Sequence, residues 1–363
     1  MKKRIYTAII LMGLIMVALA GCKKEEPVEE VTEEVVEVVE EVEETEPEEV
    51  LPENQNLLTG VCDLTEEAIG KRPVAIMVNN VEAALPQYGI AQADIIFETQ
   101  VEGDLTRFMA VYADYTQVPK VCAVRSCRYY YPAISETFDA FYVYWGMDET
   151  KRDYVESLNL TDFDGMVDGN GLFGRDKNRL NSGYALEHTA YFNGTKFASV
   201  VDDSDLRVDF AEEKKGPAFS FNGLEEQLKP EGDDCTTVNV DFGKALSTFT
   251  YDEETNTYLK KINGKDQMDG VERTQLAFTN LIILETDISV RTDTESGHKQ
   301  INWQGGDGYV GYYVSNGAVQ KINWSKESET AYIKLFDEEG NEIAINRGKS
   351  YIAMNYKGQA TFE

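Results

Sequence analysis

The chain has 363 residues, of which 42% are hydrophobic and 27% are charged, and its formal net charge at pH 7 is −31. Proteins that bind nucleic acids carry basic faces that neutralise phosphates, so this charge excludes nucleic acid as an expected partner. The apolar fraction, with 16 Phe, 20 Tyr and 3 Trp, is large enough to form a buried core.

Residues 1–21 have the pattern of a lipoprotein signal peptide. A basic start at residues 2–4 precedes an uncharged run over residues 5–21. The sequence Leu-Ala-Gly-Cys that ends at Cys22 matches a bacterial lipobox, in which the cysteine thiol receives diacylglycerol. We therefore expect cleavage before Cys22, fatty acylation of palmitate type on this residue, and an anchor on the outer face of the bacterial cell membrane.

Residues 22–56 are predicted to form an acidic, disordered tether. Fourteen Glu and no Lys or Arg lie between residues 25 and 50, and such a density of like charges keeps a chain extended and solvated. Valines at helical spacing favour a docking helix as the alternative. The body from residue 54 onward holds 50 acidic and 29 basic residues, a net charge of −21, so it is acidic as well.

Residues 57–205 are predicted to form an N-terminal α/β-type domain. Short apolar runs bounded by turns are typical of strands that are buried on both faces. They predict strands over residues 73–78, 93–98, 107–112, 121–124, 141–145 and 165–167, and helical patterns lie at 134–138, 151–158 and 195–201. This alternation indicates helices packed against a mostly buried sheet.

A polar stretch over residues 206–234 is predicted to be a linker region, and residues 235–363 a β-rich C-terminal domain. Asn-Gly and Gly-Asn turn signals separate the expected strands there. These strands are predicted at residues 236–240, 247–251, 257–262, 281–284, 309–314, 318–324, 331–336 and 342–345. The predicted fold class is therefore α+β.

Several sequence blocks carry a resemblance to a known family. They lie at residues 72–80, 93–98, 101–108, 124–129, 251–252, 263–264, 279–283, 306–310, 323–324 and 336–343. Together they resemble the YerB-type bacterial lipoproteins, a two-domain family of unknown function, over about residues 58–354. The chain departs from the family pattern at residues 187–191, where only His188 and Tyr191 match. The resemblance implies a location and an extent but no reaction.

Six charged side chains of the N-terminal half are candidates for catalysis or ligand binding. Strand ends are where loops converge in α/β sheets, so we expect these residues to lie close together. The candidates are Glu98, Glu102, Arg107, Arg125, Arg128 and His188. In a site, the arginines would hold an anionic group and a glutamate would act as a base. In the alternative, the same residues form an internal ion-pair network, and internal pairing of the two arginines at 125 and 128 is favoured because the body is acidic.

No metal ion or cofactor is expected. The chain has only two His and no Cys-x2-Cys pair, and its G-x-G-x-x-G match at residues 306–311 lies among hairpins with no following helix. Four cysteines remain besides Cys22, and their spacing leaves both disulfides and free thiols open: Cys62, Cys122, Cys127 and Cys235.

Two functions are consistent with these observations. The first is a binding or scaffolding module at the cell envelope, whose partner is a cell-wall polymer such as a glycan, or another envelope protein. The dense Tyr and Trp residues at 129–131, 142–145 and 303–313 support this function, since such side chains offer flat contact area. The alternative is an envelope hydrolase or transferase that uses the Glu/Arg/His candidates.

Overall fold

The computed structural model describes residues 51–363 with the exception of residue 168, and these residues belong to one compact unit. The predicted signal peptide, the lipidation site Cys22 and most of the predicted tether at residues 22–56 lie outside the described residues. Within residues 51–167 and 169–363, no helix is long and apolar enough to cross a membrane.

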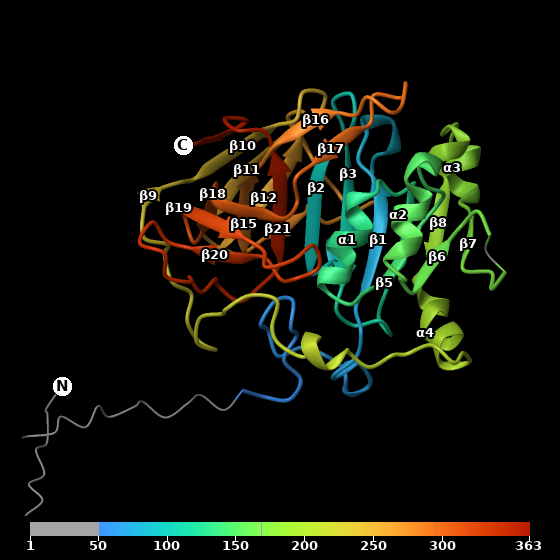
Figure 1. Ribbon diagram of the computed structural model, residues 1–363, viewed down its shortest axis with the longest axis horizontal. Helices are drawn as coiled ribbons and strands as arrows, with labels where there is room; N and C mark the ends of the chain where they lie inside the picture. Colours follow the sequence, from blue (N-terminus) through green and yellow to red (C-terminus); the bar gives the residue numbers. More distant parts are fainter. Residues whose placement is uncertain (1–50, 168) are drawn as a thin grey trace, which may run out of the picture. The chain divides into compact units, whose positions relative to one another are not determined.

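An 11-stranded sheet runs through the whole unit (Figure 1). Its strand order is β20-β19-β18-β15-β21-β2-β3-β1-β5-β6, and β9 pairs with β19. In chain order these strands are β1 (Val74–Asn79), β2 (Ile95–Glu102), β3 (Leu105–Tyr112), β5 (Phe141–Tyr144), β6 (Asp162–Asp164), β9 (Asp233–Asp234), β15 (Asn280–Glu285), β18 (Gly305–Ser315), β19 (Ala318–Ser325), β20 (Lys334–Phe336) and β21 (Ser350–Asn355).

Strand β21 joins the two halves of the sequence. It pairs in parallel with β2 on one side, where Phe97 lies opposite Ile352, and in parallel with β15 on the other, where Ile282 lies opposite the same residue. The regions predicted as separate domains, 57–205 and 235–363, thus contribute to one sheet. That each folds separately, with 206–234 as a linker, stays a prediction.

Smaller sheets flank the large one. Strands β10 (Thr237–Asp241), β11 (Leu246–Asp252), β12 (Thr257–Ile262), β13 (Lys265–Asp266), β14 (Ala277–Phe278) and β22 (Ala360–Phe362) form a six-stranded sheet. Strands β4 (Lys120–Cys122), β7 (Phe173–Arg175) and β8 (Ala190–Asn193) form a second, and β16 (Ile288–Val290) with β17 (Lys299–Ile301) a hairpin. Buried side chains of the six-stranded sheet share one core with one face of the large sheet, and Phe249 lies 4.6 Å from Tyr351 between ring centroids.

The helices are short and belong mostly to the N-terminal half. They are α1 (Tyr130–Thr137), α2 (Arg152–Ser157), α3 (Lys177–Asn181) and α4 (Gly194–Asp202), with the 3-10 turns η1 (Glu66–Ala68), η2 (Glu82–Ala84), η3 (Ile90–Gln92), η4 (Glu149–Lys151), η5 (Leu186–His188) and η6 (Glu212–Lys214). Helix α1 covers the large sheet, because Tyr131 and Ile134 share a buried core with Met77 of β1 and Met109 of β3 (Figure 1). The α+β prediction is confirmed.

Two predicted strands are wrong. Residues 165–167 form a turn, and the strand lies three residues earlier, at β6. A side chain at Gly165 would collide with the ring of Trp145 at 2.6 Å, which explains why the turn requires glycine there. Residues 342–345 make only isolated bridges, through Glu342 to Phe336 and through Ile345 to Phe221.

Candidate functional site

The candidate residues gather where three parallel strands end. Strand β5 is parallel to β1 and to β6, so their carboxyl ends lie on the same edge of the sheet. The backbone of Arg125 is fixed between two of these ends. Its N–H donates to the carbonyl of Met77 at 3.0 Å, and its carbonyl accepts from the N–H of Trp145 at 3.1 Å. Ligands of α/β sheets bind at such edges.

Glu102, Arg107 and Arg128 form an ion-pair network, here called the Glu102 network, in which both arginines are buried and Glu102 is partly buried. Glu102 ends strand β2, and one of its carboxylate oxygens accepts from Nη2 of Arg107 at 2.9 Å. The other oxygen accepts from Nε and Nη2 of Arg128 at 3.0 and 2.7 Å. Further donors reach backbone carbonyls, from Arg107 to Ser126 and from Arg128 to Cys127. Both guanidinium groups are thereby paired.

The charges of the Glu102 network shift the acidities of its members. Burial alone would raise the pKa of Glu102, but the guanidinium groups of Arg107 and Arg128 outweigh this effect and hold the pKa below its ordinary value. Burial, followed by the charge of Arg128, lowers the pKa of Arg107 to about 10. Glu102 and Arg107 are therefore both charged at neutral pH, and Glu102 is a weak base.

Arg125 lies in different surroundings. Its nearest carboxylate belongs to Glu187, at 3.8 Å from Nη2, and 54% of the Glu187 side chain is exposed. The Nε atom of Arg125 is buried and has no hydrogen-bond partner among the described residues. Arg175 lies nearby, and its pKa is lowered first by burial and then by the positive charge of Arg125. Two arginines thus lie near one another here, and the exposed carboxylate of Glu187 is the ion-pair partner that the structure shows for Arg125.

Three cavities share Arg125 as a lining residue, and together they are here called the Arg125 cleft. One of about 250 Å³ also contacts Glu102, Arg107 and His188. A second of about 180 Å³ lies beside Arg175 and Glu187. The third, of about 800 Å³, extends along β5, β6 and α2. The cleft therefore brings together four of the six predicted residues: Glu102, Arg107, Arg125 and His188.

His188 is held in the wall of the cleft by the turn η5. Its Nδ1 lies 3.1 Å from the amide nitrogen of Asn79, and its Nε2 lies 3.8 Å from the carboxylate of Glu187. Burial lowers the pKa of His188, and the nearby charges of Arg125 and Arg179 add to this effect, while Glu187 opposes it. The imidazole is therefore neutral at pH 7.

Glu98 lies outside the cleft, contrary to the expectation that it joins the other candidates. It is fully buried between the two large sheets, where it accepts from Asn80 at 2.6 Å and from Tyr351 and Thr106 at 2.7 Å. The ammonium group of Lys260, also fully buried, lies 3.5 Å away. This set of contacts pins strand β2 to strands β12 and β21 and leaves Glu98 unavailable to a ligand.

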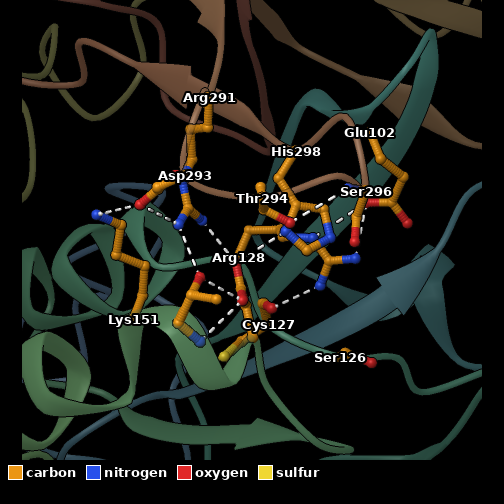
Figure 2. Close-up of polar contacts among 12 residues, drawn as sticks. Glu102, Ser126, Cys127, Arg128, Lys151, Arg291, Asp293, Thr294, Ser296 and His298 are labelled. Atoms are coloured by element: carbon orange, nitrogen blue, oxygen red, sulfur yellow. Dashed lines mark hydrogen bonds and ion pairs between the residues drawn. The ribbon is translucent and has the colours of Figure 1, made fainter.

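The sequence analysis missed a second charged network, on the loop between β16 and β17. Arg291 pairs with Asp148 at 2.6 Å, and Nδ1 of His298 lies 2.8 Å from the same carboxylate. Figure 2 shows this loop, with Ser296 and His298, beside Glu102 and Arg128, and the backbone of His298 bridges to Glu102. The available signal was His298 itself, the second of only two histidines.

The cysteine question is settled by geometry, since all four described cysteines are free. Burial raises the pKa of the Cys122 thiol to about 11 and that of Cys127 to about 12, so both are inert at neutral pH. Within the described part of the chain, no group of three or more His, Cys, Asp or Glu side chains is arranged to hold a metal ion.

Comparisons with known proteins agree with this architecture. Residues 58–207 match the family model "Protein of unknown function (DUF3048) N-terminal domain", and residues 237–352 match its C-terminal counterpart. A relative from Bacillus subtilis (strain 168), "Putative lipoprotein YerB", is 27% identical over 307 residues, which cover 81% of this chain and 84% of that protein. The crystal structure of YerB protein from Bacillus subtilis aligns with a TM-score of 0.71 at 23% identity, covering 84% of this chain and 98% of that one, and therefore shares the fold.

Proposed function

The chain belongs to the DUF3048 family of proteins of unknown function, as its resemblance to the YerB-type lipoproteins implies, and we propose that it is a lipid-anchored binding protein of the bacterial cell envelope. The name of its relative, a lipoprotein, supports a membrane anchor. Cleavage of a signal peptide before Cys22 and acylation of that residue would place the body on the outer face of the membrane. The acidic segment that follows then acts as a spacer.

We further propose that the body binds an anionic group at Arg125. The observation that carries this proposal is the guanidinium of Arg125, which lines three cavities at once. Its Nε has no hydrogen-bond partner among the described residues, and the one described carboxylate within ion-pair distance, that of Glu187, is 3.8 Å away and exposed. An oxyanion that enters the cleft accepts from the guanidinium fork and supplies the close charged partner that Glu187, at 3.8 Å, does not. Carboxylates and phosphates of wall polymers or envelope proteins have this chemistry.

The alternative, a hydrolase or transferase, has less support. One of the two glutamates predicted as a possible base, Glu98, is enclosed between two sheets. Glu102 opens to the cleft, but two guanidinium groups lower its pKa and so weaken it as a proton acceptor. His188 is the one neutral base in the cleft wall, and no described nucleophile of raised reactivity lies beside it.

The proposal is tested by titrating the purified protein with inorganic phosphate and with glucuronate at constant ionic strength. Tryptophan fluorescence is a suitable readout, since Trp145 lines the cleft, whereas Trp303 and Trp324 are buried elsewhere. We expect saturable binding that weakens about tenfold or more in Arg125→Gln. Lys229→Gln, which removes one positive charge at an exposed pair with Asp234, is the matched control and keeps the affinity of the unmodified protein. Equal affinities in the two variants would overturn the proposal.

A further inference from the structure

Arg125 lies in the middle of the cleft that bears its name. The cavities of about 250 and 180 Å³ share Glu187 as well as Arg125, and those of about 180 and 800 Å³ share Trp145. The three therefore follow one another along the edge where β1, β5 and β6 end. A ligand that meets Arg125 has room to continue in both directions.

This position decides where the anionic group of the ligand sits. A small anion, or a chain with its charge at one end, would leave the space on at least one side of Arg125 unused. A chain with the charge on an internal unit uses both sides. We infer that the ligand is a linear glycan in which an anionic sugar unit is flanked on both sides by uncharged units. This inference rests on the proposed binding of an anion at Arg125.

The charges of the largest cavity support uncharged flanking units. Of its two arginines, Arg152 is already paired, with Glu149 at 2.7 Å and with Glu156 at 3.5 Å. Asp162 and Asp164 also line this cavity, and neither makes an ion pair with a described residue. A second anion directly beside the first would therefore meet like charges. Sugar hydroxyls, in contrast, donate hydrogen bonds to carboxylates.

The cavity lining also favours a glycan over a peptide. Trp145, which is partly buried, and the exposed Asn159 supply the mixture of aromatic and polar surface that suits a sugar ring with its hydroxyls. An extended peptide would gain most of its affinity by adding a strand to the sheet edge. The edge strand here, β6, has only three residues and carries Asp162 and Asp164, so it offers few backbone groups for pairing.

The test compares four probes by calorimetry at fixed ionic strength. The first is a hyaluronan hexasaccharide, in which an uncharged N-acetylglucosamine separates successive carboxylates. The second is a galacturonate hexasaccharide, with a carboxylate on every unit, and the third a neutral N-acetylglucosamine hexasaccharide. The fourth is free glucuronate. We expect hyaluronan to bind at least about tenfold more tightly than either glucuronate or the galacturonate chain. The neutral chain should bind the unmodified protein no more tightly than it binds the Arg125→Gln variant.

Two variants sharpen this comparison. Asp162→Asn removes from the largest of the three cavities one carboxylate that has no ion-pair partner among the described residues, and it should raise the affinity for the galacturonate chain more than the affinity for hyaluronan. Lys229→Gln serves again as the control that changes neither. An Arg125-dependent affinity for glucuronate that does not increase with chain length would overturn the inference and leave the proposed function standing.

Other outcomes are equally decisive. If no anion binds in an Arg125-dependent manner, the proposed function fails first. If the galacturonate chain binds as tightly as hyaluronan, the argument from the acidic cavity wall is wrong and the inference falls with it. A blocked Gly-Gly-Glu-Gly-Gly peptide is added to the four sugar probes, and tighter binding of this peptide than of hyaluronan would replace the glycan by a protein segment.

Discussion

Arg125 and Arg128 are three residues apart in the chain, yet they differ in burial and in ion pairing: Arg128 belongs to the Glu102 network, and Arg125 lines the Arg125 cleft. Arg128 has a side chain that is 9% exposed and donates two hydrogen bonds to one carboxylate. Arg125 is 30% exposed, and the one carboxylate within ion-pair distance of it in residues 51–167 and 169–363, that of Glu187, is 3.8 Å away. The internal pairing expected for both arginines is close and doubly hydrogen-bonded for Arg128, whereas Arg125 has only a long ion pair with the exposed Glu187.

This difference separates a structural role from a binding role. The donors of Arg128 are directed at Glu102 and at the carbonyl of Cys127, so that the protein itself compensates for its burial. The guanidinium group of Arg125 lines three cavities and makes no close ion pair, so its donors can bind a ligand. Proximity in the sequence is thus a poor guide to function here, and the partners of each guanidinium group are a better one.

Removal of the central carboxylate should have the largest effect on stability. In Glu102→Ala, Arg107 and Arg128 lose their shared partner while both stay buried, and breaking a buried ion pair costs about 3–5 kcal/mol. Urea unfolding followed by circular dichroism measures the loss. Glu187→Ala is the control on the side of the Arg125 cleft and should change the free energy of unfolding by less than about 0.5 kcal/mol. Equal losses in the two variants would erase the distinction between the regions.

The pH dependence of stability should sharpen the same comparison. The pKa of Glu102 in the folded protein lies below its ordinary value of 4.5, so the unfolded chain takes up the proton first as the pH falls. Its stabilising contribution is therefore complete above about pH 4.5 and is lost progressively below it. A protonated glutamate resembles glutamine, so the stability difference between the unmodified protein and Glu102→Gln should be largest at pH 7 and should decrease as the pH falls below about 4.5. A difference that stayed constant over this range would contradict the role assigned to the network.

The local sequence predicted much of this molecule because many of its signals are local. Apolar runs bounded by turns located β1, β2, β3 and β5 within three or four residues at either end, and helical patterns located α1, α2 and α4. Strand β21 was missed, although residues 351–354 are apolar. Its partners β2 and β15 lie far away in the chain, and no local pattern specifies a parallel pairing with such distant strands.

The candidate site shows the same limit at the level of single residues. Glu98 and Glu102 are four residues apart, a spacing that places both on one face of a regular strand. The register of β2 against β3 shifts between Gln100 and Glu102, and the two glutamates have different partners. A β-bulge of this kind re-aims a side chain without a signature in the local composition. The sequence therefore identified both acids as candidates and could not separate the buried one from the one in the cleft.

The smallest expected effect is the one that tests the comparison most directly. Arg125→Ala removes a guanidinium whose Nε is buried without a partner, and it leaves behind only Glu187, which is already exposed to water. The free energy of unfolding should therefore change by less than about 0.5 kcal/mol in either direction. Arg128→Ala is the matched substitution three residues away, and it should cost about 1.5–3 kcal/mol, because it removes charged hydrogen bonds to Glu102.

Thermal melts with and without phosphate complete the test: Arg125→Ala should lose the stabilisation by phosphate while it keeps its melting temperature, and Arg128→Ala should melt earlier but still respond to phosphate. The reverse pattern would assign the binding role to Arg128 and the structural role to Arg125.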